Sequence, residues 1–278
     1  MEVSVVICAK NAEKTLEQCL ESVRKNNPSE IIVVDDGSTD KTVEISRRYA
    51  NEIYFNEGKG LSYARQLGAE KASHNYVFYV DSDVTLTENC LAIMLEEMEK
   101  RRYAGIHAQV VGLRNTSYWD WAEDQHFRLR FNKEGPRNSI TFMAGIYRKD
   151  IIVEHRFDPF FAGAGEDGDL CRRLRKSGLT LGISSAFVYH LHRDTARGFI
   201  KQRIWYGKGN ARIFWKYKSL SALFGVSAMI PFGIIVCIRK RSPKMLPYYL
   251  VWTLASAYGT LSELTSLTIR RLMPNVPK

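Results

Sequence analysis

The sequence predicts an α/β fold in which a parallel sheet is covered by helices on both faces. Three observations support this. Short apolar runs alternate with segments of helical spacing through residues 1–194. Polar residues follow the strand ends at Ala9, Asp35 and Asp81, and ligands of open α/β sheets bind at that edge. The composition, 45% apolar and 25% charged, is that of a globular protein and excludes disorder, collagen and coiled coil.

The elements are expected in alternating order. The first strand covers residues 3–9 (VSVVICA), and Leu16, Leu20 and Val23 then recur at helical spacing. The later elements are strands at 31–34, 53–55 and 76–80 and helices at 61–73 and 88–102. Uninterrupted apolar strands between helices are typical of parallel sheets buried on both faces.

The C-terminal third differs in charge from the rest of the chain. The chain carries 40 Lys and Arg against 30 Asp and Glu, but residues 195–278 contain 14 of the basic residues and a single acid, Glu263. We expect three parts: a catalytic domain at 1–194, a basic amphipathic interface helix at 195–218, and a hydrophobic helical hairpin at 219–278. An anionic membrane surface is the expected partner. Nucleic acid is not expected, because nucleic-acid-binding arms are polar throughout.

The hairpin contains uncharged stretches that are long enough to reach a bilayer. Residues 219–238 are twenty residues without a charge, and about 20 can cross the hydrocarbon core. The basic turn at 239–244 opposes two full spans, because basic residues favour the cytosolic side. A re-entrant or interface-lying hairpin is therefore favoured over two transmembrane helices. A pair of buried helices in a soluble protein is the alternative.

The cysteines and the N-terminus bear on the compartment. The chain has five cysteines with no CxxC spacing, which favours a reducing cytoplasm over a disulfide framework or zinc site. The first residues have no basic segment and no cleavage site of a signal peptide. We expect the catalytic domain on the cytoplasmic side of the cell membrane.

Two carboxylates follow the strand at 76–80. Asp81 and Asp83 flank Ser82 on the loop that leaves this strand. Such a pair can hold one Mg²⁺ or Mn²⁺ ion together with substrate phosphates. The alternative is an acidic turn that caps the helix starting near Glu88.

Two further segments carry carboxylates beside glycines. Residues 34–40 read VDDGSTD after the strand at 31–34, and a carboxylate there can accept hydrogen bonds from a nucleobase or a ribose. Residues 163–173 read GAGEDGDLCRR, where glycines let the loop approach a ligand. Acids at the start of the following helix also compensate its dipole.

Together, AKN at 9–11, VDDGSTD, GKGLSYARQLGA at 58–69, YVDSD at 79–83, MAG-x-x-R at 143–148 and GAGEDGDLCRRL resemble, in order and spacing, the family 2 glycosyltransferases. The resemblance covers about residues 1–195. It implies a GT-A type fold with a mixed, mainly parallel sheet, and metal-dependent, inverting transfer of a sugar from a nucleotide-sugar donor.

The resemblance also implies residue roles. Asp167 is the catalytic base, with Glu166 beside it. Asp83 is the metal ligand, Asp81 lies near the ribose and the metal, and His190, with His192 as a weaker candidate, lies near the metal and diphosphate. The remaining donor-binding residues are Ala9, Lys10, Asn11, Asp36 (nucleobase), Lys59, Arg65, Ser82, Met143, Ala144 and Gly145. The cofactor is Mg²⁺ or Mn²⁺, and the donor is linked to UDP or GDP.

The acceptor is the least specified part. Trp119 and Trp121 lie in a variable region, where they either stack on an acceptor or pack on the sheet. The arginine of the Q-x-x-R-W motif of processive synthases is missing at 202–205. A polyprenyl-linked saccharide or polyprenyl phosphate fits membrane attachment. The alternatives are a glycosyltransferase with a soluble acceptor, and a non-catalytic relative that binds sugar nucleotides or glycans. A second copy of the chain is a further expected partner, in a homo-oligomer.

Overall fold

The computed structural model of the protein describes residues 2–161, 163–220, 223, 229–239 and 243–273. The chain forms two compact units. The first contains Met1–Asn115, Glu123–Ala162 and Glu166–His192, and the second contains Thr116–Ala122, Gly163–Gly165 and Arg193–Lys278. The expected boundary between a catalytic domain and a C-terminal part at 194/195 stays a prediction.

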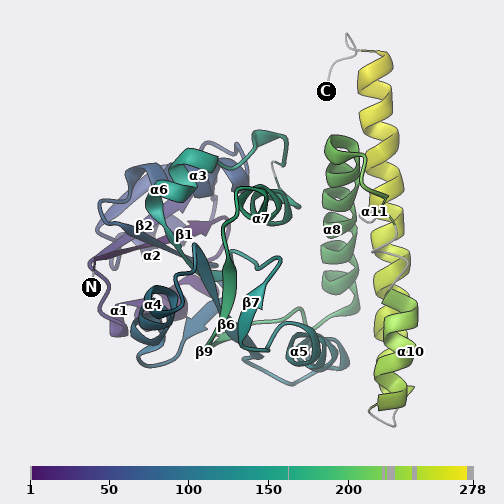
Figure 1. The fold of residues 1–278 in the computed structure, drawn as a ribbon, viewed down its shortest axis with the longest axis horizontal. Coiled ribbons are helices and arrows are strands. Elements are labelled where there is room, and N and C mark those ends of the chain that lie inside the picture. Colours follow the sequence, from purple (N-terminus) through teal and green to yellow (C-terminus); the bar gives the residue numbers. More distant parts are fainter. Residues whose placement is uncertain (1, 162, 221–222, 224–228, 240–242, 274–278) are drawn as a thin grey trace. The chain divides into compact units, whose positions relative to one another are not determined.

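The first unit is built on one mixed sheet (Figure 1). The described residues form nine strands: β1 (Val3–Ala9), β2 (Glu30–Asp35), β3 (Glu52–Phe55), β4 (Tyr76–Val80), β5 (Val84–Leu86), β6 (Gly105–Gly112), β7 (Gly135–Arg137), β8 (Ala144–Arg148) and β9 (Leu181–His190). Their order is β3-β2-β1-β4-β8-β6-β9-β5, with β7 beside β9. The expected strands at 3–9, 31–34, 53–55 and 76–80 are confirmed.

Strand direction divides the sheet. β3, β2, β1 and β4 are parallel, and β9 runs parallel to β6. β8 is antiparallel to both β4 and β6, while β5 and β7 are antiparallel to β9. The mixed sheet expected from the family resemblance is confirmed, whereas the purely parallel sheet expected from the apolar runs is wrong. β8 runs in reverse because the chain enters it from the same edge at which β4 ends.

Helices cover both faces of this sheet. In the first unit and at its boundary they are α1 (Leu16–Lys25), α2 (Thr42–Ser46), α3 (Leu61–Lys71), α4 (Cys90–Lys100), α5 (Tyr118–Arg130), α6 (Lys149–His155) and α7 (Glu166–Lys176), with a 3₁₀ turn at Pro159–Phe161. One core joins α1, α2 and α4 to one face, and another joins α3, α6 and α7 to the opposite face. The alternation of Val5 and Val6 between these two cores follows from the two-residue period of a strand.

α3 packs closely on β1 through a glycine. A Cβ at Gly68 would lie 2.3 Å from Cγ1 of Val6. Any larger residue would push the helix away from the sheet. This contact fixes the position of α3, which carries Arg65 towards Asp81 at the end of β4.

The second unit contains α8 (Ala196–Tyr217), α10 (Met229–Arg239), a 3₁₀ turn at Pro243–Met245, and α11 (Leu246–Leu272). α8 and α11 touch backbone to backbone, because a Cβ at Gly207 would lie 2.1 Å from the Ser256 carbonyl oxygen. Nε of Arg212 forms an ion pair with Oε1 of Glu263 at 2.9 Å.

The expected C-terminal helical segment is thus present. α8 covers nearly the same residues as the helix expected at 195–218, and its role as an interface helix stays a prediction. The expected hairpin at 219–278 lies partly outside the described residues, including Lys240 and Arg241 of its turn. In the portion of the chain that the structure describes, no helix combines the length and the apolar character needed to cross a bilayer.

Candidate active site

The carboxyl ends of β1, β2 and β4 place the predicted donor-binding residues at one edge of the sheet. Ala9 pairs with Asp35 in register, and the Asp36 N–H donates to the Ala9 carbonyl at 2.9 Å. Lys10 and Asn11 continue from β1, and Asp81 continues from β4. Parallel strands bring these loops together because their carboxyl ends meet at the same edge.

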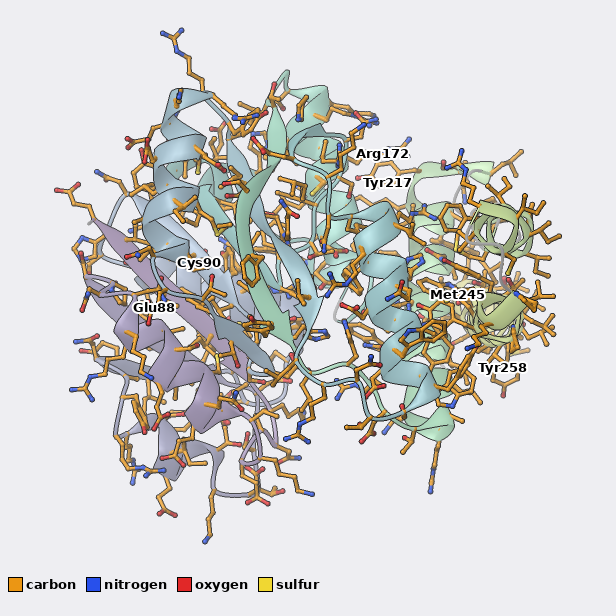
Figure 2. The ribbon with its side chains drawn as sticks, turned by 90° about the horizontal axis from the view of Figure 1, so that it is seen from below. Glu88, Cys90, Arg172, Tyr217, Met245 and Tyr258 are labelled. Atoms are coloured by element: carbon orange, nitrogen blue, oxygen red, sulfur yellow. The ribbon has the colours of Figure 1, made fainter. Side chains whose placement is uncertain are left out.

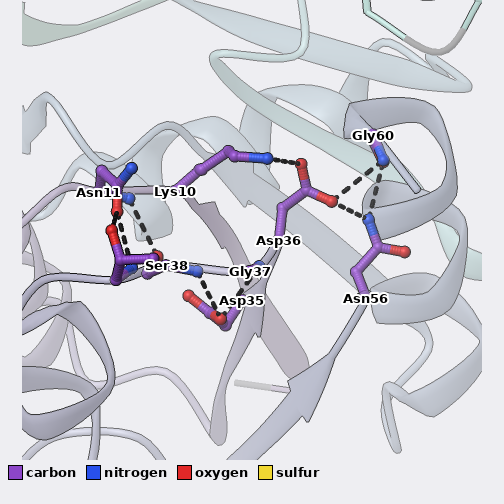
Figure 3. Close-up of polar contacts among 9 residues, drawn as sticks. Lys10, Asn11, Asp35, Asp36, Gly37, Ser38, Asn56 and Gly60 are labelled. Atoms are coloured by element: carbon purple, nitrogen blue, oxygen red, sulfur yellow. Dashed lines mark hydrogen bonds and ion pairs between the residues drawn. The ribbon is translucent and has the colours of Figure 1, made fainter. Parts of the chain in front are cut away.

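The Asp36 carboxylate joins three loops (Figure 3). Its Oδ1 accepts hydrogen bonds from Nδ2 of Asn56 at 2.5 Å and from the Gly60 N–H at 3.0 Å. Its Oδ2 lies 3.4 Å from Nζ of Lys10. Oδ1 is therefore committed to the protein, and Oδ2 keeps acceptor capacity for a ligand donor group.

The loop after β1 is tied to the loop after β2. The Asn11 N–H donates to Oγ of Ser38 at 2.9 Å, and the Thr39 N–H donates to Oδ1 of Asn11 at 2.9 Å. Asn11 has a φ of 50°, in the left-handed region that asparagine tolerates better than most residues. Figure 3 shows both loops beside Asp36.

Lys59 is exposed on the loop before α3. Its Nζ lies 3.3 Å from Oε2 of Glu57 and 5.1 Å from the centre of the Tyr63 ring. The structure thus places Lys59 near Gly60, whose N–H donates to Asp36.

Arg65 links the donor edge to the start of α7. Its Nη2 lies 3.1 Å from Oδ1 of Asp81, and its Nη1 lies 2.7 Å from Oε1 of Glu166. Its guanidinium also lies 5.6 Å from the Phe142 ring centre. A buried guanidinium needs such partners because its desolvation is costly.

Glu166 and Asp167 open α7 and differ in environment. Glu166 is buried, and its Oε2 has no hydrogen-bond partner. Burial first, and then the adjacent Asp167 carboxylate, raise the pKa of Glu166 to about 8, while Arg65 opposes the shift. Burial also raises the pKa of Asp167, and its Oδ1 accepts from the Gly168 N–H at 2.7 Å. Asp167 stays partly exposed, so it is the accessible carboxyl of the two.

Asp83 and His190 meet because β5 pairs with β9. Val84 lies opposite His190 in the register, and Nε2 of His190 lies 3.4 Å from Oδ1 of Asp83. The Nδ1 atoms of His190 and His192 are 2.9 Å apart. His192 is buried and stacks on Phe127 with ring centres 5.4 Å apart.

The segment before β8 is held by His107, a residue that the sequence analysis did not select. Nδ1–H of His107 donates to the Ala108 carbonyl, an assignment that follows from the other contacts of the ring. Its Nε2 lies 2.7 Å from Oγ1 of Thr141 and accepts from the Ala144 N–H at 3.2 Å. Burial lowers the pKa of His107 to about 4, so the ring stays neutral near neutral pH.

Met143, Ala144 and Gly145 lie at this segment. The Met143 carbonyl accepts from the Asp81 N–H at 2.8 Å, which connects it to the carboxylate loop. Gly145 pairs with both Tyr79 and His107. His107 therefore supports the backbone beside Asp81.

Trp119 and Trp121 belong to the second unit. The Trp119 ring stacks on Phe199 with centres 4.9 Å apart, and the Trp121 ring centre lies 6.0 Å from that of Tyr118. Both are partly buried against the aromatic core of that unit. Their described ring contacts are with this aromatic core and not with the sheet as the alternative had it, and acceptor stacking stays a prediction.

Comparison with known protein families decides the relationship. The model of glycosyl transferase family 2 matches residues 4–161, more than half of the chain. The chain belongs to the family 2 glycosyltransferases. The matched span contains Asp36, Arg65, Asp81, Asp83 and His107.

Individual members of the family share limited sequence identity with this chain. The uncharacterized glycosyltransferase YibD of Escherichia coli K12 is 29% identical over 183 residues, which cover 58% of this chain and 52% of YibD. The chain thus spans about half the length of this relative, and smaller shares of others.

Solved structures show the fold of this family 2 glycosyltransferase. TarS 1–349 of S. aureus in complex with UDP-GlcNAc is 16% identical, covers 96% of this chain and 92% of its own, and has a TM-score of 0.54. Glucosyl-3-phosphoglycerate synthase of Mycobacterium tuberculosis, with Mn²⁺, UDP and glucosyl-3-phosphoglycerate, is 18% identical, covers 76% and 78%, and has a TM-score of 0.57. The expected GT-A-like mixed sheet flanked by helices is confirmed.

The Mn²⁺ of such structures raises the question of a metal site in this glycosyltransferase. Among the described residues, no cluster of three or more His, Cys, Asp and Glu is arranged to hold a metal. Asp83 and His190 nevertheless form an oxygen and nitrogen donor pair, and Asp81 leaves the same loop. This donor set fits Mn²⁺ or Mg²⁺ when diphosphate oxygens complete the coordination.

Proposed function

We propose that the protein transfers a sugar from a UDP- or GDP-linked donor to an acceptor with inversion at the anomeric carbon. The observation that carries this proposal is the pair of ion contacts from Arg65 to Asp81 and Glu166. They hold the donor edge and the start of α7 together within the first unit. A base on α7 is then beside a nucleotide site.

In this proposal the donor is bound by residues at the three strand ends. Oδ2 of Asp36 accepts a hydrogen bond from the nucleobase, and Lys10, Asn11 and Lys59 line the nucleotide. Asp83 and His190, with Asp81, would hold a divalent cation. A bound cation stabilises the negative charge that develops on the departing diphosphate.

Asp167 accepts the proton of the acceptor hydroxyl. Its raised pKa makes its carboxylate a stronger base than a solvent-exposed aspartate. A base positioned in this way contributes about 10²–10⁴-fold in rate. Attack from the face opposite the diphosphate inverts the anomeric centre in one displacement. A phosphate acceptor is already ionised, and Asp167 would then orient it.

The proposed acceptor is a polyprenyl-linked saccharide or polyprenyl phosphate at the cytosolic membrane face. The basic and apolar C-terminal third supports this choice, because an anionic lipid acceptor and its membrane would both meet that part of the chain. A soluble acceptor remains the second candidate.

The test is turnover of a panel of UDP- and GDP-sugars by the full chain with Mn²⁺, measured as release of nucleoside diphosphate. Asp167→Asn should lower turnover by about 10²-fold or more while donor affinity stays within a few-fold. Asp150→Asn is the matched control, since Asp150 is exposed and paired with Arg148 at the opposite end of β8. Donor binding without turnover would establish the non-catalytic alternative, and an unchanged rate in Asp167→Asn would remove Asp167 as the base.

A further inference from the structure

α11 carries an exposed face without charge. Exposed positions recur every three or four residues at Leu246, Leu250, Leu254, Tyr258, Leu261 and Thr265, and Ile269 continues this face. Leu254 is 62% exposed, and Tyr258 and Leu261 are each 65% exposed. In the described helix, no exposed position from 246 to 269 is charged. At about 1.5 Å per residue, this outer face is ~35 Å long. Figure 2 shows side chains, including Tyr258, projecting from the helix.

The opposite side of α11 packs on α8 within the second unit. Gly259 meets the Ile204 carbonyl of α8, since a Cβ there would lie 2.1 Å from its oxygen. Oγ1 of Thr260 donates to the Gly207 carbonyl at 2.9 Å. The outer face of α11 therefore points away from α8, and α8 cannot cover it.

The single acid of the C-terminal third is kept off this face. Glu263 is buried on the inner side and pairs with Arg212 on α8. The helix packing thus withdraws the one negative charge that an anionic surface would repel.

α10 adds to the apolar surface, and basic residues lie at its C-terminal end and at both ends of α11. Ile234, Ile235 and Ile238 of α10 are exposed, and this helix packs on α11 through Gly233 against Tyr249. Within the described part of the chain, the exposed basic residues that flank the two helices are Arg239, Lys244, Arg270 and Arg271. Apolar surface between cationic ends complements the acyl boundary and the headgroups of an anionic membrane.

We infer that the outer face of α11, together with Ile234, Ile235 and Ile238 of α10, is a docking surface for an anionic lipid membrane. A second copy of the chain fits less well, because residues 195–278 carry 14 basic residues and one acid, and like charges would face each other. The inference deepens the membrane acceptor of the proposed function, but binding can be measured without sugar transfer.

The test is flotation of the full chain with vesicles of phosphatidylglycerol and phosphatidylcholine, compared with vesicles of phosphatidylcholine alone. The double variant Leu254→Glu/Leu261→Glu should bind the anionic vesicles at least about 100-fold more weakly, about tenfold for each leucine, or ~1.4 kcal/mol. The matched control is Ile93→Glu/Leu129→Glu, which makes the same kind of change at two exposed apolar residues of α4 and α5. It should float like the wild type.

The outcomes separate the alternatives. Equal flotation of the α11 variant and the wild type overturns the docking surface, and equal binding to neutral vesicles overturns the requirement for anionic lipid. A wild-type dimer in solution that the α11 variant disperses identifies the surface as a contact between copies and also overturns the inference. Unchanged melting temperatures in both variants show that the fold is intact. Donor hydrolysis by the α11 variant should equal that of the wild type, so loss of sugar transfer in all forms would refute the proposed function alone.

Discussion

Replacing Arg65 by methionine tests the link between the donor edge and α7. The side chain of Arg65 is 5% exposed and that of Glu166 is 4% exposed, whereas Asp81 is 35% exposed. Methionine keeps much of the apolar stem and removes the charge. Asp81 can then be solvated by water, but Glu166 becomes a buried carboxyl without a counter-ion.

Breaking a buried ion pair by removing one partner costs about 3–5 kcal/mol, and we expect the loss of unfolding free energy in Arg65→Met to approach this size only as pH rises above about 8, the pKa of Glu166 in the wild type. The contact with Asp81 adds little, because exposed ion pairs are screened. Burial and Asp167 already raise the pKa of Glu166, and among the groups that lower it Arg65 has the largest effect. Without Arg65 the folded-state pKa rises further above the unfolded value. Below about pH 8 Glu166 is protonated in both folded proteins, so the loss should be small there; it should grow as pH rises above about 8, where Glu166 ionises in the wild type but still holds its proton in Arg65→Met.

The assay is urea unfolding of Arg65→Met, Glu166→Gln and the double variant, at about pH 6 and about pH 9.5, on either side of the Glu166 pKa. All five tryptophans lie in the second unit, so hydrogen exchange of α3 and α7 is the readout for the first. The double variant should recover more than about 2 kcal/mol of the loss in Arg65→Met, because no buried charge is left unpaired. Additive losses, or a loss in Arg65→Met that is the same at both pH values, would refute the reasoning.

Three other predictions concern chemistry at the same edge. Asp83→Asn should weaken Mn²⁺-dependent UDP binding by at least about tenfold in calorimetry, whereas equal binding with and without Mn²⁺ in the wild type would contradict a metal site. Turnover should fall on acidification with a midpoint above the ordinary aspartate pKa, because the pKa of Asp167 is raised and only its ionised form accepts a proton; a pH–rate profile with a midpoint at or below that value would remove this role. His107→Phe leaves the Ala144 N–H and the Thr141 hydroxyl without their acceptor, so kcat/KM for the donor should fall by about tenfold, or ~1.4 kcal/mol. His107→Gln should recover part of the lost kcat/KM. Equal kcat/KM in His107→Phe and the wild type would show that the contacts of His107 with Thr141 and Ala144 have no effect on turnover of the donor.

The sequence predicted the elements whose evidence is local. The strand at 76–80 is an uninterrupted β-branched and aromatic run, and α3 and α4 follow the helical spacing. The reversed direction of β8 could not be predicted in this way. The five residues of β8 carry no local signal of strand direction, and the direction follows only from the antiparallel pairing with β4 and β6.

In the candidate site, too, the sequence predicted residues with local signals but not contacts between distant segments. Carboxylates after strands pointed to Asp36, Asp81 and Asp83, because strand ends are recognisable from sequence. His107 lies in the apolar run GIHAQVVG and resembles a core histidine; its role depends on Thr141 and Ala144, which only the sheet brings near. Arg65 did leave a signal, since an arginine on the buried face of a helix requires acidic partners. Nothing local indicates that one of them is Glu166, 101 residues later.

The pairing of β5 with β9 sets an order of assembly during synthesis. Among the residues that the structure describes, the partners of the Asp36 carboxylate are Lys10, Asn56 and Gly60, all within the first 60 residues. Asp83 meets His190 only after β9 has emerged from the ribosome. Translation at about 5–20 residues per second separates these two residues by on the order of 5–20 s. The nascent chain can therefore complete the Asp36 cluster early, whereas the contact between Asp83 and His190 forms late.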